Sequence, residues 1–143
     1  MKIICIVFAG FMLPWSAAVS ADWQTISQGA DHVRMIDLET VARSKGYVKA
    51  WTMTTYWSEQ TTRSYPIVKY RSVKELSYFN CGDRTAFTAQ AVYYEREAGE
   101  GEVRHSVIDS IATSKFSEVV PDSVGEANLR TACSLTKAAK RMG

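Results

Sequence analysis

A succession of alternating segments joined by turns is the feature that most restricts how this 143-residue chain can fold. Residues 47–57 are rich in aromatic, Thr and β-branched residues. In a strand, successive side chains would point to opposite faces, which places Val48 and Tyr56 on the same face. The later segments of this kind are residues 68–80, 84–95 and 103–111. Glycine-containing turns at 81–83 and 99–101 separate them. Strands that follow one another through turns predict an antiparallel meander.

Two shorter strands are expected before this run, at residues 23–26 and 32–36. Residues 37–44 show no clean helical stripe and are interpreted as one helical turn or a tight connection. Residues 58–66 are polar and end in a proline, which predicts a loop. The expected sheet therefore has about six strands.

Near the C-terminus the apolar residues change from the alternating spacing of a strand to the spacing of a helix, which predicts a helix over residues 124–140. Ser123 and Glu126 have the spacing of a capping box, which typically begins a helix. Two apolar stripes compete for the buried face. One includes Val124 and Leu135, and the other includes Leu129 and Cys133.

Residues 1–21 have the three-part form of a secretory signal. Lys2 precedes an apolar run over residues 3–13, and small residues at 19–21 form a cleavage site. The run is shorter than the roughly 20 apolar residues that a membrane-spanning helix needs, which disfavours an uncleaved anchor. We therefore expect a single domain over residues 22–143, with no stable membrane anchor after cleavage, in the periplasm or outside the cell.

Cys5 would leave with the signal, so Cys81 and Cys133 would remain. Exported compartments are oxidising, and an even cysteine count there favours a disulfide. The alternatives are a metal site, which would need further ligands, and a catalytic thiol, which would leave the other cysteine unexplained. With a disulfide, the helix would face the sheet through the stripe that includes Cys133, at which small Ala132 permits close approach.

Charge and motifs disfavour several classes of function. The formal net charge is +2, and it becomes +1 without Lys2, so no basic surface for nucleic acid is indicated. No nucleophile elbow, P-loop or dinucleotide fingerprint is present. His32 and His105 are 73 positions apart and lack neighbours at metal-ligand spacing. We expect no cofactor, no metal site and no enzymatic activity.

The aromatic residues near the 58–66 loop are the candidates for binding. Tyr56, Trp57 and Tyr65 would form an exposed recognition face, although packing within the sheet is the alternative use of such rings.

The residues that carry a family resemblance are distributed along the chain. In order they are Ile36-Asp37, Gly46 before Trp51, Tyr70-Arg71-Ser72, Phe79-Asn80-Cys81 followed by Arg84, Gly99-x-Gly101, Val120-Pro121-Asp122-Ser123 and Leu129-x-x-x-Cys133. Together they resemble the surface-adhesin protein E family of Gram-negative bacteria. The resemblance implies an antiparallel sheet with a C-terminal helix tethered by a disulfide. It also implies an envelope location and adhesion to host extracellular-matrix and serum proteins.

The sequence thus predicts an α+β fold in which a C-terminal helix packs on one face of a meander sheet. The favoured function is a non-enzymatic envelope module that binds a host or envelope protein, and a homodimer is compatible with it. The alternative is a periplasmic small-ligand-binding or enzymatic domain with a pocket between sheet and helix.

Overall fold

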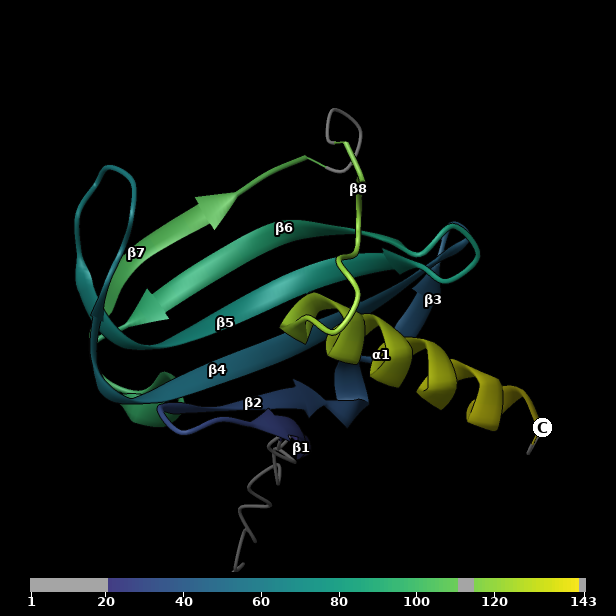
Figure 1. The fold of residues 1–143 in the computed structure, drawn as a ribbon, viewed down its shortest axis with the longest axis horizontal. Helices are drawn as coiled ribbons and strands as arrows, with labels where there is room; N and C mark the ends of the chain where they lie inside the picture. Colours follow the sequence, from purple (N-terminus) through teal and green to yellow (C-terminus); the bar gives the residue numbers. More distant parts are fainter. Residues whose placement is uncertain (1–20, 111–114, 142–143) are drawn as a thin grey trace, which may run out of the picture.

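A twisted antiparallel sheet with one helix lying across part of one face makes up the described part of the chain, residues 21–110 and 115–141 of a computed structural model (Figure 1). The strands are β1 (Trp23–Gln28), β2 (His32–Asp37), β3 (Ala42–Ser44), β4 (Tyr47–Thr61), β5 (Lys69–Asn80), β6 (Thr85–Tyr94), β7 (Val103–Ile108) and β8 (Ser117–Glu118). The helix is α1 (Val124–Arg141), and the short 3-10 turns are η1 (Leu38–Thr40) and η2 (Glu97–Gly99). The predicted signal segment lies outside the described residues.

The sheet order is β1-β2-β4-β5-β6-β7, and every neighbouring pair is antiparallel. This confirms the predicted meander. Two short strands were not predicted: β3 pairs with the start of β4, and β8 pairs with the start of β6. Residues 37–44, expected as a helical turn or a tight connection, form η1 followed by β3.

The strand β4 is longer than the sequence indicated. It continues to Thr61, so the predicted loop over 58–66 begins four residues late, and the β4–β5 connection spans residues 62–68. Beyond a register shift, Gln60 and Thr61 still pair with β5. Ser58 and Glu59 are exposed on this arm of the hairpin. Polar residues therefore continue the strand, because a hairpin arm that extends beyond the core can be solvated on both faces.

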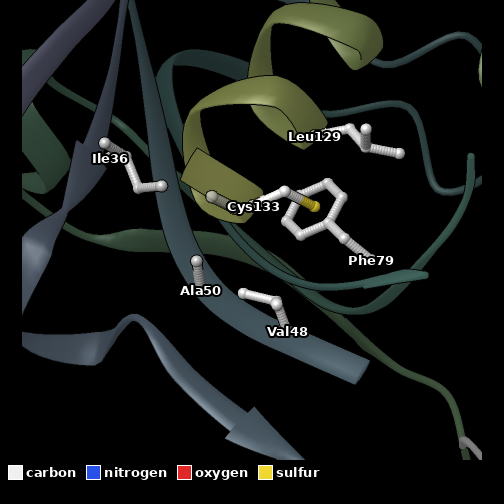
Figure 2. Packing of buried hydrophobic residues seen from close by; sticks show 7 residues of the cluster. Ile36, Val48, Ala50, Phe79, Leu129 and Cys133 are labelled. Carbon is white, nitrogen blue, oxygen red and sulfur yellow. The ribbon is translucent and has the colours of Figure 1, made fainter. Parts of the chain in front are cut away.

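Part of one sheet face is covered by α1, and the hydrophobic core lies between them (Figure 2). The sheet contributes Ile36, Val48, Ala50 and Phe79, and the helix contributes Leu129, Ala132 and Cys133. Ala132 is fully buried, and its small side chain allows the helix and the sheet to approach closely at this point. The stripe that includes Cys133 is thus the buried one, as predicted.

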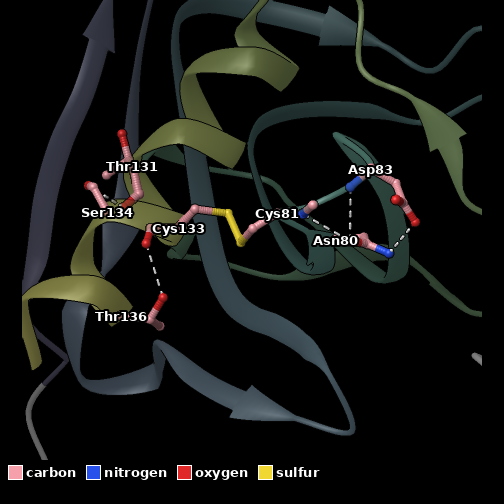
Figure 3. The surroundings of a disulfide bond; sticks show 8 residues. Asn80, Cys81, Asp83, Thr131, Cys133, Ser134 and Thr136 are labelled. Carbon is pink, nitrogen blue, oxygen red and sulfur yellow. Dashed lines mark hydrogen bonds between the residues drawn. A yellow bond between two sulfur atoms is a disulfide. The ribbon is translucent and has the colours of Figure 1, made fainter. Parts of the chain in front are cut away.

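The disulfide between Cys81 and Cys133 joins the turn after β5 to the middle of α1 (Figure 3). The neighbouring Asn80 side chain accepts hydrogen bonds from the backbone N–H groups of Gly82 at 3.1 Å and Asp83 at 3.2 Å. Such side-chain bonds to the backbone stabilise a tight turn. The predicted pairing is confirmed, and the turn that holds Cys81 is locally ordered.

The start of α1 follows the predicted capping pattern with one change. Ser123 Oγ accepts a hydrogen bond from the N–H of Glu126 at 3.2 Å. The Glu126 carboxylate, however, accepts from the N–H of Asp122 at 2.8 Å instead of Ser123, and it also binds Arg84. The Asp122 N–H lowers the pKa of the Glu126 carboxyl, and Arg84 lowers it further. The helix start is thereby linked to the turn before β6.

The opposite face of the sheet is covered at one end by η2. Ser72 Oγ donates to the carbonyl of Arg96 at 2.5 Å and accepts from the N–H of Gly99 at 2.9 Å. The N–H of Ala98 donates to Thr55 Oγ1 at 3.1 Å. Gly99 has φ +73°, and a Cβ there would lie 2.2 Å from Lys74 Cε. Because the Lys74 side chain is flexible and can move aside, it is the positive φ that favours glycine at this position.

Candidate functional site

Arg34 on β2 lies at the boundary between the covered and the open half of the helix-bearing face. Its Nε donates to Asn128 Oδ1 on α1 at 3.0 Å. Its other nitrogens donate to Thr54 Oγ1 at 2.6 Å and Thr52 Oγ1 at 3.0 Å, and Nη2 lies 2.8 Å from a Glu75 carboxylate oxygen. This largely buried network joins three strands to the helix, and it satisfies polar groups that the helix would otherwise leave unpaired.

Beyond Arg34, the open half of this face carries one aromatic ring from each of five neighbouring strands. In strand order they are His32, Tyr56, Tyr70, Tyr93 and His105, and we call them the ring row. Successive ring centroids are 5.9, 5.9, 4.9 and 5.9 Å apart. The pairing of His32 with Tyr56, and of Tyr93 with His105, places each pair on the same face of the sheet.

The rings of the row do not form a flat surface. Tyr70 stands at 82° to Tyr56 and at 75° to Tyr93, so the three tyrosines pack edge to face. Edge-to-face packing is a favourable arrangement of aromatic rings and holds each ring in one orientation. The row is therefore a ridged platform whose shape is set by contacts between its own members.

A hollow of about 590 Å³ lies over the ring row, and we call it the tyrosine hollow. The five rings of the row line it, together with Asp31 before β2 and Gln60, Arg63 and Tyr65 from the end of β4 and the connection after it. Its volume is within the range of small-molecule and peptide sites. The hollow combines aromatic surface with hydrogen-bonding groups, as binding sites do.

Burial raises the pKa of the tyrosines of the ring row, Tyr56, Tyr70 and Tyr93. Their hydroxyls therefore stay protonated at neutral pH. The Tyr56 and Tyr70 hydroxyls hydrogen-bond to each other, which leaves two of the three donors for a ligand. At the edge of the hollow the Asp31 carboxylate lies 2.7 Å from His32 Nδ1, and this hydrogen bond lowers the pKa of the Asp31 carboxyl. The hollow thus presents neutral hydroxyl donors together with the Arg63 guanidinium and the Asp31 carboxylate, which is hydrogen-bonded to His32.

The three residues that the sequence singled out for binding do not all meet. Tyr56 and Tyr65 line the tyrosine hollow, and Tyr65 is 95% exposed at its rim. Trp57 is 44% exposed but does not line the hollow. Its carbonyl accepts a hydrogen bond from Arg71, which also pairs with Glu97. Trp57 therefore belongs to a neighbouring surface.

Exposed apolar side chains gather at this end of the sheet. Ile67, in the β4–β5 connection, is 62% exposed, and Val103 at the start of β7 is also exposed. Both line a shallow hollow of about 470 Å³ that is flanked by charged side chains such as Glu59 and Arg104. Together with Trp57 and Tyr65 they form what we call the apolar end.

Sequence reasoning missed three members of the ring row: His32, Tyr70 and His105. The two histidines were set aside because they are 73 positions apart. The meander brings them to one face through three intervening strands. The signal that could have found them is strand register, which a single sequence does not fix where a bulge intervenes, as it does between β4 and β5.

The alternative of a ligand pocket between sheet and helix has a weaker structural basis. The interface is filled by the hydrophobic core, and a small hollow of about 200 Å³ lies beside it, between Val41 and Leu135. A groove of about 520 Å³ runs along the flank of α1 next to Ile26. Glu126 lines that groove, but both of its carboxylate oxygens are already bonded, to the Asp122 N–H and to Arg84.

Within residues 21–110 and 115–141, no group of three or more His, Cys, Asp or Glu side chains is placed to hold a metal ion. In the same part of the chain, no helix has both the length and the apolar character needed to cross a membrane.

Comparison with known proteins identifies a matching family and solved structures of similar fold. The family model described as surface-adhesin protein E matches residues 23–134. No match was found among curated proteins. Two crystal structures of protein E are similar to this fold, one from Haemophilus influenzae and one from non-typeable Haemophilus influenzae. The first is 15% identical, with a TM-score of 0.55, over 86% of this chain and 94% of that one. The second is 14% identical, with a TM-score of 0.54, over 89% of this chain and 85% of that one.

Proposed function

The chain belongs to the surface-adhesin protein E family, and on that premise we propose that it is an exported, non-enzymatic envelope protein that binds a protein partner through the apolar end of its sheet. The partner class is a host extracellular-matrix or serum protein, or another envelope protein. The binding unit is the folded domain over residues 22–143.

The observation that carries this proposal is the exposure of large apolar side chains at one end of the molecule. Trp57, Tyr65 and Ile67 are all exposed, and they come from the end of β4 and the connection after it. Exposed apolar groups that gather in this way, with charged residues around them, mark interaction surfaces. Tryptophan and tyrosine are also the residue types that most often dominate binding energy.

The charged surroundings of the apolar end suit a protein interface. Glu59 pairs with Lys69 at 2.7 Å, and Arg104 lies 2.6 Å from Glu95. These exposed pairs contribute little stability, since solvent screens them. They form the polar rim that typically encloses the apolar centre of an interface.

We expect the double variant Trp57→Ser, Ile67→Ser to lose binding. Both side chains are exposed, so the change removes contact area without opening a cavity in the core. Loss of an aromatic anchor should weaken affinity by about tenfold or more. The measurement is surface plasmon resonance against immobilised extracellular-matrix, serum and envelope proteins.

Val120→Ser is the matched control for this double variant, because Val120 is also exposed and lies before α1, away from the apolar end. It should bind as the unchanged protein does. Equal binding by the double variant and the control would contradict the proposal. Size-exclusion chromatography of the same samples shows whether a monomer or a homodimer is the binding unit.

Export is tested separately. If residues 1–21 are a cleaved signal, the mature protein begins at Asp22, and mass spectrometry of the purified protein should give the mass of residues 22–143. Fractionation should recover it from the periplasm or the medium, and digestion of intact cells with protease shows whether it reaches the surface. Retention of residues 1–21, or recovery in the cytoplasm, would contradict this proposal.

A further inference from the structure

We propose that the tyrosine hollow binds a proline-rich segment in the polyproline II conformation, with the ring row as its platform. This inference rests on the proposed function, which makes the partner a protein. It specifies which segment of that partner would enter the hollow. The hollow lies next to the apolar end.

The chemistry of the tyrosine hollow suits a polyproline II segment. A polyproline II helix has no internal hydrogen bonds, and its carbonyl groups are free to accept bonds from a binding surface. It therefore needs a surface that combines apolar rings with donors and few acceptors. The Tyr56 and Tyr70 hydroxyls hydrogen-bond to each other, so two of the three tyrosine donors among the rings remain for a ligand. Arg63 at the rim adds a guanidinium that forms no ion pair within the described residues.

The spacing of the rings is close to the repeat of a polyproline II helix. The ring centroids of Tyr56 and Tyr93 lie 5.9 and 4.9 Å from that of Tyr70, so they are at most 10.8 Å apart, the sum of these two distances. A polyproline II helix repeats every three residues at about 3.1 Å per residue, or about 9.3 Å. Successive turns of the ligand would therefore meet Tyr56 and Tyr93, with Tyr70 between the turns.

The length of the ring row agrees with the same ligand. From His32 on β2 to His105 on β7 the row crosses five neighbouring strands. The successive centroid distances of 5.9, 5.9, 4.9 and 5.9 Å limit the row to 22.6 Å, their sum. Seven residues of polyproline II span about 22 Å. Aromatic-lined grooves that bind proline-rich segments use the same combination of rings and donors.

The ring orientations disfavour an oligosaccharide as the occupant. Stacking of sugar rings needs flat aromatic faces, and the tyrosines here stand nearly perpendicular to one another, at 82° and 75°. Asp31 and Arg63, one carboxylate and one guanidinium, both line the hollow, and their opposite charges suit an uncharged ligand.

The test is isothermal titration of the purified full-length gene product with an acetylated, amidated decaproline, which is uncharged and forms polyproline II. A Gly-Ser peptide of the same length is the control ligand. We expect the decaproline to bind and the Gly-Ser peptide not to bind. Tyr93→Ala should weaken decaproline binding by about tenfold or more, because an aromatic anchor is lost.

Tyr78→Ala is the matched control variant, since Tyr78 is also a half-buried strand tyrosine but does not line the hollow. Its affinity for the decaproline should stay within about twofold of the unchanged protein, inside the spread expected of near-neutral positions. Tyr65→Ser provides a second variant that does not disturb packing, because Tyr65 is exposed at the rim. It should weaken binding severalfold even if Tyr93→Ala fails to fold.

Three results would overturn the inference: no decaproline binding, equal binding of the Gly-Ser peptide, or unchanged affinity in Tyr65→Ser and Tyr93→Ala. Binding of cellohexaose that Tyr93→Ala abolishes, in place of decaproline binding, would also overturn it and assign the hollow to a saccharide. The proposed function is judged independently, by the loss of partner binding in the Trp57→Ser, Ile67→Ser variant.

Discussion

Removal of the Cys81–Cys133 disulfide is expected to lower the free energy of unfolding by about 4 kcal/mol. The bond closes a chain segment whose ends are 52 residues apart, and a loop of that length loses much entropy in the unfolded state when it is cross-linked. The bond also holds α1 on the sheet, where Cys133 is part of the core. Guanidinium denaturation of the double variant Cys81→Ala, Cys133→Ala, compared with the unchanged protein, measures the loss.

A reductant provides the control for this experiment. It should destabilise the unchanged protein by a similar amount and leave the double variant unaffected, since no disulfide remains to be reduced. Alanine replaces the buried sulfur without adding a polar group, so the comparison reports the cross-link and a small loss of packing. A change below about 1 kcal/mol would contradict the prediction, because it is far less than loop closure of this length implies.

Phe79→Ala is expected to cost about 3–5 kcal/mol of stability. Phe79 is 2% exposed and is the largest of the fully buried side chains. It lies opposite Val48 on β4 and packs under α1 (Figure 2). Truncation removes the buried ring and leaves a cavity that the disulfide-tethered helix cannot easily fill. The midpoint of thermal unfolding, followed by circular dichroism, should fall by about 10–20 °C for a domain of this size.

Phe87→Ala is the matched control, because Phe87 lies on the same sheet but is only half-buried. Its ring contacts Phe116 at 5.9 Å between centroids, outside the main cluster. Its cost should be less than half that of Phe79→Ala, in proportion to the smaller area it buries. Similar losses in the two variants would show that the core is not centred under α1.

The larger elements of the fold were predictable because their signals are local. Alternation in residues 47–57 indicated β4, and the Ser123–Glu126 spacing indicated the start of α1. The disulfide followed from cysteine count and compartment, and it selected the buried face of the helix. Each of these features can be recognised from residues that are close in the sequence, or from the one pairing that two cysteines allow.

The candidate site was less predictable because it depends on register and on long-range partners. Tyr56 and Tyr65 were selected from their position near a loop, and both line the tyrosine hollow, whereas Trp57 does not. Arg34 gave no signal, since its partner Asn128 lies 94 positions away on the helix. Pairings of this kind emerge only when the sheet has been assembled, and the bulge between β4 and β5 changes which residues share a face.

The ring row has a consequence for immunological detection of this protein. Its five rings come from positions 32 to 105, one from each of five strands, so no continuous stretch of sequence contains the surface they form. Antibodies raised against linear peptides will not recognise it. Antibodies against the folded surface will instead bind a discontinuous epitope, and their binding will be lost when the sheet is denatured.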